Sequence, residues 1–227
     1  MALAMPALRT LAPHLRDAQV LSLGYPDILA TEEEVEEIFG VKPEHTINAG
    51  AQHHIKRPLV ETVALFKLLG STLDCVDIVR TRGVERVLDL NEPHDLGEYD
   101  LVIDPGTTEH CFNIGQAMMT AARSVRVGGH IYHSHPLSMM NHGFYNVCPT
   151  MPYDFYTQNG WKVKLMEARH WVFDMAVPIP PEAAVTRYAK AEREVSVITL
   201  AQRLTGAELR WPLQTKYLRM AQQRAAA

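Results

Sequence analysis

Cysteine, positive charge and long hydrophobic runs are all scarce in this chain, and each shortage excludes a class of protein. The three cysteines, Cys75, Cys111 and Cys148, are widely spaced and form none of the pairs that bind zinc or cross-link a small secreted scaffold. No run of about eighteen apolar residues is present, so no membrane-spanning helix is expected. Residues 1–10 lack the basic start and long apolar core of a signal peptide, and we therefore expect a cytoplasmic protein.

Basic charge is too scarce for a general nucleic-acid-binding protein. The 22 Lys and Arg residues are outnumbered by 26 Asp and Glu residues, which gives a net charge of -4. Binding to phosphates requires a basic surface, and we interpret the local group Arg80, Arg82 and Arg86 as solvated surface. With 47% hydrophobic residues in 227, the chain is expected to form one domain that spans residues 1–227.

Strand and helix patterns alternate along the chain, which predicts an open, mostly parallel sheet with helices on both faces, an α/β three-layer sandwich. Helices are expected after Thr31, with Glu34 completing a capping box and Gly40 ending the helix, and over residues 58–69, 108–124 and 153–160. The strands are expected over residues 19–23, 73–77, 86–90, 99–104, 130–133, 161–168 and 195–200.

Two connections, residues 41–57 and 134–150, fit no regular element. Long connections in compact domains often carry function, so both are candidate substrate loops. Each is rich in side chains that contact ligands; the first contains His45, His53 and His54, and the second contains His135, His142 and Cys148.

Polar residues and glycines follow the ends of the expected strands, where an open parallel sheet binds its ligands. Asp77 ends the second strand, and one carboxylate there suits the two neighbouring hydroxyls of a ribose. Asp89 and Leu90 end the third strand and offer an acceptor and an apolar wall to an adenine ring, although a simple strand-ending turn explains them equally well. Residues 104–106 end the fourth strand, before Glu109.

These residues resemble a known family, the class I S-adenosylmethionine (SAM) dependent methyltransferases. The resemblance covers about residues 19–168 and includes the strand over 99–104, the Glu109-His110 pair and the glycine pair Gly128-Gly129. The run Asn141-His142-Gly143-Phe144-Tyr145 is similar to a Gly-His-Gly-Phe-Tyr run that follows the fifth strand in one subgroup.

The resemblance implies a Rossmann-like methyltransferase fold with a mostly parallel seven-stranded sheet whose last strand is antiparallel. It also implies SAM as the cofactor and an O or N nucleophile of a small molecule as the methyl acceptor. The expected cofactor contacts are Gly24, Asp77, Asp89, Leu90, Asp104, Gly106 and Glu109.

The turn after the first strand departs from the family pattern. Of the usual Gly-x-Gly-x-Gly series only Gly24 remains, followed by Tyr25 and Pro26, and Asp27 is a candidate for a displaced carboxylate. Two alternatives therefore stay open: a catalytically inactive methyltransferase-like binding or scaffold subunit, and an enzyme that uses the crevice for another nucleoside ligand. Residues 213–224 are a candidate surface for homo-oligomers.

Eleven histidines are present, several of them in the candidate loops. Methyl transfer to a hydroxyl or amine requires removal of a proton, and His110 or His135 is the expected base. His142, Phe144 and Tyr145 are expected to contact the substrate. A metal site with Asp104 or Glu109 is an alternative, but the chain has neither a His-x-x-x-His helix nor a Cys-x-x-Cys pair, and we expect no metal.

Overall fold

The structure, a computed structural model, describes residues 1–48, 50–170, 176–179 and 194–225. Its main element is an eight-stranded sheet with the order β11-β10-β12-β9-β8-β2-β6-β7. Strands β7, β6, β2, β8 and β9 are parallel, whereas β12 is antiparallel to both of its neighbours. The bounds are β2 (Gln19–Leu23), β6 (Thr72–Asp77), β7 (Arg86–Val87), β8 (Tyr99–Asp104), β9 (Val125–Pro136), β10 (Trp161–His170), β11 (Ala176–Pro178) and β12 (Val195–Arg203).

This sheet confirms the predicted α/β class and the antiparallel last strand. Two strand predictions need correction. β7 ends at Val87, so Asp89 and Leu90 lie in the turn that follows it, and β9 is much longer than the predicted 130–133. The described residues also contain β11, which the sequence does not predict because its three residues are all exposed and show no alternation.

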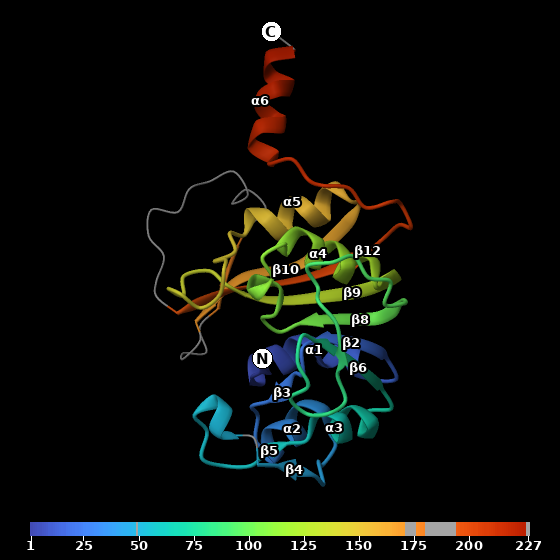
Figure 1. The fold of residues 1–227 in the computed structure, drawn as a ribbon, viewed down its shortest axis with the longest axis vertical. Helices are drawn as coiled ribbons and strands as arrows, with labels where there is room; N and C mark the ends of the chain where they lie inside the picture. The colour runs from blue at the N-terminus through green and yellow to red at the C-terminus, as the bar shows by residue number, and fades with distance from the viewer. Residues whose placement is uncertain (49, 171–175, 180–193, 226–227) are drawn as a thin grey trace.

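Helices cover both faces of the sheet (Figure 1). A separate hydrophobic core lies between the sheet and the helices on each face. On β8, Val102 joins the core under α4 (Ile114–Arg123) and α5 (Thr150–Gln158), while its neighbours Leu101 and Ile103 join the opposite core. That second core is covered by α1 (Met5–Leu15), α2 (Glu32–Phe39) and α3 (Thr62–Leu68). Burial on both faces explains the three consecutive apolar residues 101–103 of β8.

Capping side chains set where the helices begin. α2 has the predicted capping box, since Thr31 Oγ1 accepts from the Glu34 amide at 3.1 Å and Glu34 Oε2 accepts from the Thr31 amide at 2.7 Å. The helix predicted over 58–69 begins later, because Glu61 caps α3. The helix predicted over 108–124 is divided into the short 3-10 helix η2 (Thr108–His110) and α4, which Asn113 caps.

A small second sheet of order β1-β3-β5-β4 lies beside α2 (Figure 1). Its strands are β1 (Ala2–Leu3), β3 (Asp27–Ile28), β4 (Thr46–Ile47) and β5 (Leu59–Val60). The candidate loop over 41–57 therefore includes β4 and the 3-10 helix η1 (Gly50–His53).

The last helix, α6 (Thr215–Ala225), extends away from the domain (Figure 1) and buries none of its side chains. No helix in the described ranges is long and apolar enough to cross a membrane.

Candidate functional site

The sheet contains a topological switch point between β2 and β8. These two strands are parallel neighbours, yet the chain after β2 passes to the face covered by α2 and α3, while the chain after β8 passes to α4 on the opposite face. Two glycines with positive φ follow the two strands, Gly24 at +82° and Gly106 at +101°. Open α/β sheets bind ligands at such a point, outside the carboxyl ends of the strands.

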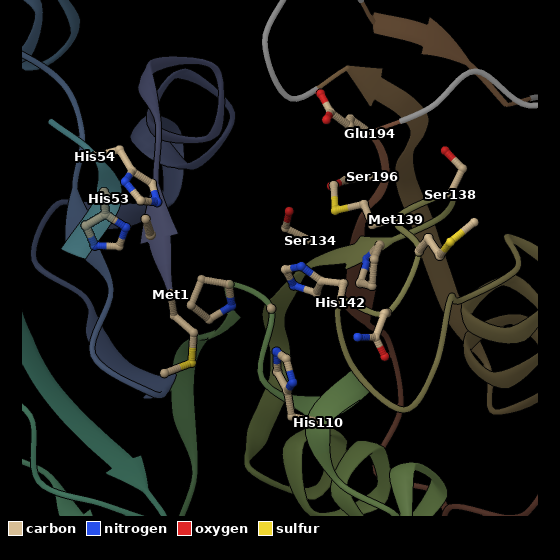
Figure 2. A pocket seen from close by; sticks show the side chains of 16 residues that line it. Met1, His53, His54, His110, Ser134, Ser138, Met139, His142, Glu194 and Ser196 are labelled. Carbon is tan, nitrogen blue, oxygen red and sulfur yellow. The ribbon is translucent and has the colours of Figure 1, made fainter. Parts of the chain in front are cut away.

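A cavity of about 910 Å³ lies at this edge of the sheet. Gly106 and His110 from the segment after β8, and Ser134 and His142 from β9 and the loop after it, form part of its wall. Figure 2 shows His53 and His54, from the 41–57 loop, on the opposite wall, with Met1 between the two groups. Both candidate loops therefore reach one cavity, and four histidines face it.

Beneath the cavity, Asp104 is the centre of a fully buried hydrogen-bond network. Its Oδ1 accepts from the amides of Thr107 (2.8 Å) and Thr108 (3.3 Å). Its Oδ2 accepts from Thr108 Oγ1 (2.6 Å), His133 Nδ1 (2.9 Å) and His135 Nε2 (2.9 Å). Both carboxylate oxygens are thus committed to the protein itself, and Asp104 fixes the end of β8 against β9.

Burial is the largest single influence on Asp104 and opposes its ionisation, but the charge of His135 and the hydrogen bonds from His133 and His135 together outweigh burial and hold the pKa of Asp104 well below its usual range. Burial also acts against the charged form of His135, yet the adjacent Asp104 raises the pKa of that imidazole. For His133, burial lowers the pKa, and its Nε2 lies 2.5 Å from the Tyr156 hydroxyl. Asp104 and His135 therefore each favour the charged form of the other.

The two predicted proton acceptors lie in different surroundings. His110 faces the cavity with about half of its side chain exposed. His135 is fully buried and is held by Asp104 and by Thr108 Oγ1 at 2.7 Å. Contact with a substrate is therefore open to His110 only, as the structure stands.

Glu109 lies between the buried network and the cavity. The residue is fully buried, and within the described residues neither carboxylate oxygen has a hydrogen-bond partner. Burial, followed by the charge of Asp104, raises the pKa of Glu109 to about 7. Its Oε1 lies 3.6 Å from His142 Nε2 and 3.9 Å from His110 Nε2, so the carboxylate faces two imidazoles of the cavity wall.

The turn of residues 141–145 packs directly on the segment after β8. The Phe144 amide donates to the Glu109 carbonyl oxygen at 3.0 Å, Tyr145 donates its hydroxyl to the Phe112 carbonyl oxygen at 2.8 Å, and the rings of Phe112 and Phe144 meet edge to face. Phe144 and Tyr145 thus support the turn that carries His142. Their contact with a substrate stays a prediction.

The resemblance noted above has a glycine where this chain has Asn141. Asn141 has a φ of +57°, a conformation that asparagine adopts more readily than most side chains. Asparagine at this position is therefore compatible with the left-handed backbone of the turn.

Among the predicted nucleoside contacts Asp77, Asp89 and Leu90, Asp77 has a buried oxygen without a hydrogen-bond partner among the described residues. Asp77 is buried at the end of β6; its Oδ1 accepts from the Val79 amide at 3.3 Å, and its Oδ2 has no partner among the described residues. Asp89 is exposed, and its Oδ1 accepts from the Asn91 amide and side chain at 2.9 and 2.7 Å. Leu90 is buried in the core beneath.

At the first strand end, the Met1 side chain lies directly over Gly24. A Cβ added to Gly24 would lie 2.1 Å from Met1 Sδ and 3.0 Å from Thr107 Oγ1. Thr107 also donates to the Leu23 carbonyl oxygen, so it joins the ends of β2 and β8. Sequence reasoning assigned no role to Thr107 or Thr108; the only signal was their place after a predicted strand end.

Asp27 does not offer a free carboxylate. It binds the Arg82 guanidinium through Nε (3.1 Å) and Nη2 (2.7 Å), and His53 Nε2 at 2.8 Å. Arg82 is accordingly mostly buried, with 14% of its side chain exposed, which corrects its interpretation as solvated surface. The ion pair ties the connection after β6 and the 41–57 loop to β3.

The chain matches no known family model and no curated protein. Among solved structures, it is similar to a Burkholderia thailandensis 1,6-didemethyltoxoflavin-N1-methyltransferase with bound 1,6-didemethyltoxoflavin and S-adenosylhomocysteine (15% identity, TM-score 0.49, 87% of this chain and 77% of that one). It is also similar to a putative methyltransferase from Bacillus halodurans (13%, TM-score 0.43, 88% and 99%). A third is a Haloferax volcanii complex of the Trm112 methyltransferase activator and a putative methyltransferase (13%, TM-score 0.46, 88% and 88%). Because these TM-scores are all below 0.5, the function proposed below rests on the geometry of this chain itself.

Proposed function

We propose that this protein is a SAM-dependent methyltransferase that acts on an O or N nucleophile of a small molecule. The observation that carries the proposal is the switch point between β2 and β8, with Gly24 and Gly106 in positive-φ conformations at the two strand ends. Glycines there allow a ligand to approach the backbone closely. The histidine-lined cavity at the same edge of the sheet has room for a methyl acceptor.

The buried Oδ2 of Asp77 supports a nucleoside ligand. A buried carboxylate oxygen without a partner is unfavourable, and a ribose supplies two neighbouring hydroxyl donors. In this proposal Asp77 binds the ribose, and Asp89 and Leu90 flank the base. The rest of the cofactor lies against the backbone of Gly24 and Gly106. Asp104 acts indirectly, because its oxygens are already bonded to Thr108, His133 and His135; it positions Gly106 and Glu109.

The reaction is an in-line displacement at the methyl group of the sulfonium. The acceptor oxygen or nitrogen forms a bond to the methyl carbon, the carbon–sulfur bond breaks, and its electron pair remains on sulfur as a thioether. The acceptor gives up its proton to the imidazole of His110. The protein mainly has to position the two reactants and exclude competing water, and His110 is the predicted catalytic residue that faces the acceptor.

One observation favours the second candidate, an inactive methyltransferase-like binding subunit. The Met1 side chain fills the space over Gly24, and a bound cofactor requires it to move. Calorimetric titration of the purified chain with S-adenosylhomocysteine separates the two. Binding of one equivalent supports the methyltransferase. If the folded chain binds neither SAM nor S-adenosylhomocysteine, the inactive binding subunit is the candidate that remains.

A further inference from the structure

We infer that Glu109, His110 and His142 form a binding site for one divalent transition-metal ion on the cavity wall. One potential ligand atom from each residue lies within 4.8 Å of those of the other two, and Glu109 Oε1 lies 3.6 Å from His142 Nε2 and 3.9 Å from His110 Nε2. Two ligands of a tetrahedral zinc ion lie about 3.4 Å apart, from metal bonds of about 2.1 Å. Small side-chain movements therefore bring the three atoms to coordinating distance.

The state of Glu109 is the independent observation that indicates a cation. The carboxyl group is completely enclosed, yet both of its oxygens lack hydrogen-bond partners within the described residues. Burying such a group without a partner costs about 1–3 kcal/mol for a neutral polar group and more for a charge. A cation bound between Glu109 and the two imidazoles supplies the missing partner and neutralises the charge.

The surrounding backbone is built to hold the three ligands together. His142 approaches because the Phe144 amide binds the Glu109 carbonyl oxygen. Gly143 permits that approach, since a Cβ there would lie 3.0 Å from both the Glu109 carbonyl oxygen and His110 Nδ1. The motif pair singled out in the sequence, Glu109-His110 and the His142-Gly143 turn, is therefore a single structural unit.

A second cluster, Asp104 with His133 and His135, has similar spacing but a different character. Both oxygens of Asp104 already accept hydrogen bonds, and all three side chains are sealed from solvent. At Glu109, by contrast, the two histidines are 49% and 45% exposed and leave the ion open to the cavity. An ion at this site keeps coordination positions for an exogenous ligand.

The ligand set selects the type of ion. Imidazole nitrogens suit Zn²⁺, Fe²⁺, Ni²⁺ and Cu²⁺, whereas Mg²⁺ and Ca²⁺ prefer oxygen ligands. Two histidines and one carboxylate with open positions are typical of metal centres that bind a substrate directly. This proposal departs from the expectation that the chain binds no metal, and it gives His110 the role of a metal ligand in place of that of proton acceptor.

The site itself does not depend on methyl transfer; only the role of the ion rests on the proposed function. In that role the ion binds the acceptor hydroxyl or amine in the cavity. Coordination by a divalent cation makes loss of a proton easier, and the proton passes to water.

The test uses the full chain, stripped with a chelator and titrated with Co²⁺ and with Zn²⁺ by calorimetry and, for Co²⁺, by visible absorption. We expect one equivalent of either ion to bind and the cobalt form to show ligand-field bands. Glu109→Gln and His142→Ala should each lower the affinity at least about tenfold. His45→Ala, at an exposed histidine outside the cluster, should bind like the unmodified chain.

His142→Ala is the decisive variant, because its side chain is nearly half exposed and its removal leaves the buried network intact. Circular dichroism verifies the fold of each variant before titration. Failure of the folded chain to bind Co²⁺ or Zn²⁺, or unchanged affinity in both Glu109→Gln and His142→Ala, would overturn the proposal. Titration with S-adenosylhomocysteine is a separate measurement, so loss of the proposed function and loss of the metal site are distinguishable.

Discussion

The amide N–H of Phe144 donates a hydrogen bond to the carbonyl oxygen of Glu109 at 3.0 Å. This contact fastens the turn after β9 to η2, and it places His142 beside His110, with ring centroids 5.3 Å apart. Two short motifs from different connections thereby share one wall of the cavity. Their juxtaposition, more than either motif alone, gives the candidate site its chemistry.

Gly143→Ala tests this packing. The added Cβ would lie 3.0 Å from the Glu109 carbonyl oxygen, which belongs to the backbone and cannot turn aside, and 3.2 Å from Glu109 Cγ. We expect a loss of about 1–3 kcal/mol in the free energy of unfolding, measured by urea denaturation, together with weaker Co²⁺ binding. Gly206→Ala is the matched control, since its Cβ would meet only Val127 Cγ2 at 3.7 Å. Equal stability of the two variants contradicts the tight approach of the turn.

Asp77→Ala tests the nucleoside contact. Hydrogen bonds to a charged group contribute about 1.5–3 kcal/mol each, so we expect the affinity for S-adenosylhomocysteine to fall by about tenfold or more. Asp95→Asn, at an exposed turn, serves as the control in the same calorimetric titration. If Asp77→Ala binds as tightly as the unmodified chain, the ribose contact is wrong.

The sequence predicts the sheet well because burial on both faces makes β2, β8 and β12 mostly apolar. It does not predict α1, since Pro6 and Pro13 suggest a broken segment, although Pro6 lies in the first turn, where proline is tolerated. It identifies Asp104 by its place at a strand end, but its network with His133 and Tyr156 depends on the register of β8 against β9. That register is a tertiary property. The approach of His142 to Glu109 is also a tertiary property, because it depends on the hydrogen bond between Phe144 and Glu109.

Arg82→Ala tests the ion pair behind the 41–57 loop. Asp27 is 4% exposed. Without the Arg82 guanidinium, its buried carboxylate keeps only the bond to His53 of the two contacts described above. Breaking a buried ion pair costs about 3–5 kcal/mol, so a decrease toward that range is expected in the free energy of unfolding. Arg80→Ala, at an exposed position, should change it little. Equal denaturation midpoints for both variants would show that the pair does not stabilise the fold.

His130 should make the stability depend on pH. Burial, then the charges of His14, Lys164 and Arg126, lowers the pKa of His130 from 6.5 to about 4, and the rings of His14 and His130 lie 4.1 Å apart. Between those two pH values the unfolded chain binds a proton at His130 that the folded chain does not. Stability contributed by the neutral imidazole is therefore complete above pH 6.5 and decreases as the pH falls toward 4.

The variant His130→Gln lacks this titration. We expect the difference between its melting temperatures at pH 7 and pH 5 to be smaller than that of the unmodified chain. Part of the pH dependence should remain, because burial and then the charge of Lys164 also lower the pKa of His14. Differential scanning calorimetry at both pH values measures the effect. His94→Gln, at a half-buried histidine in the turn after β7, is the control. An unchanged pH dependence in His130→Gln assigns the destabilisation to other groups.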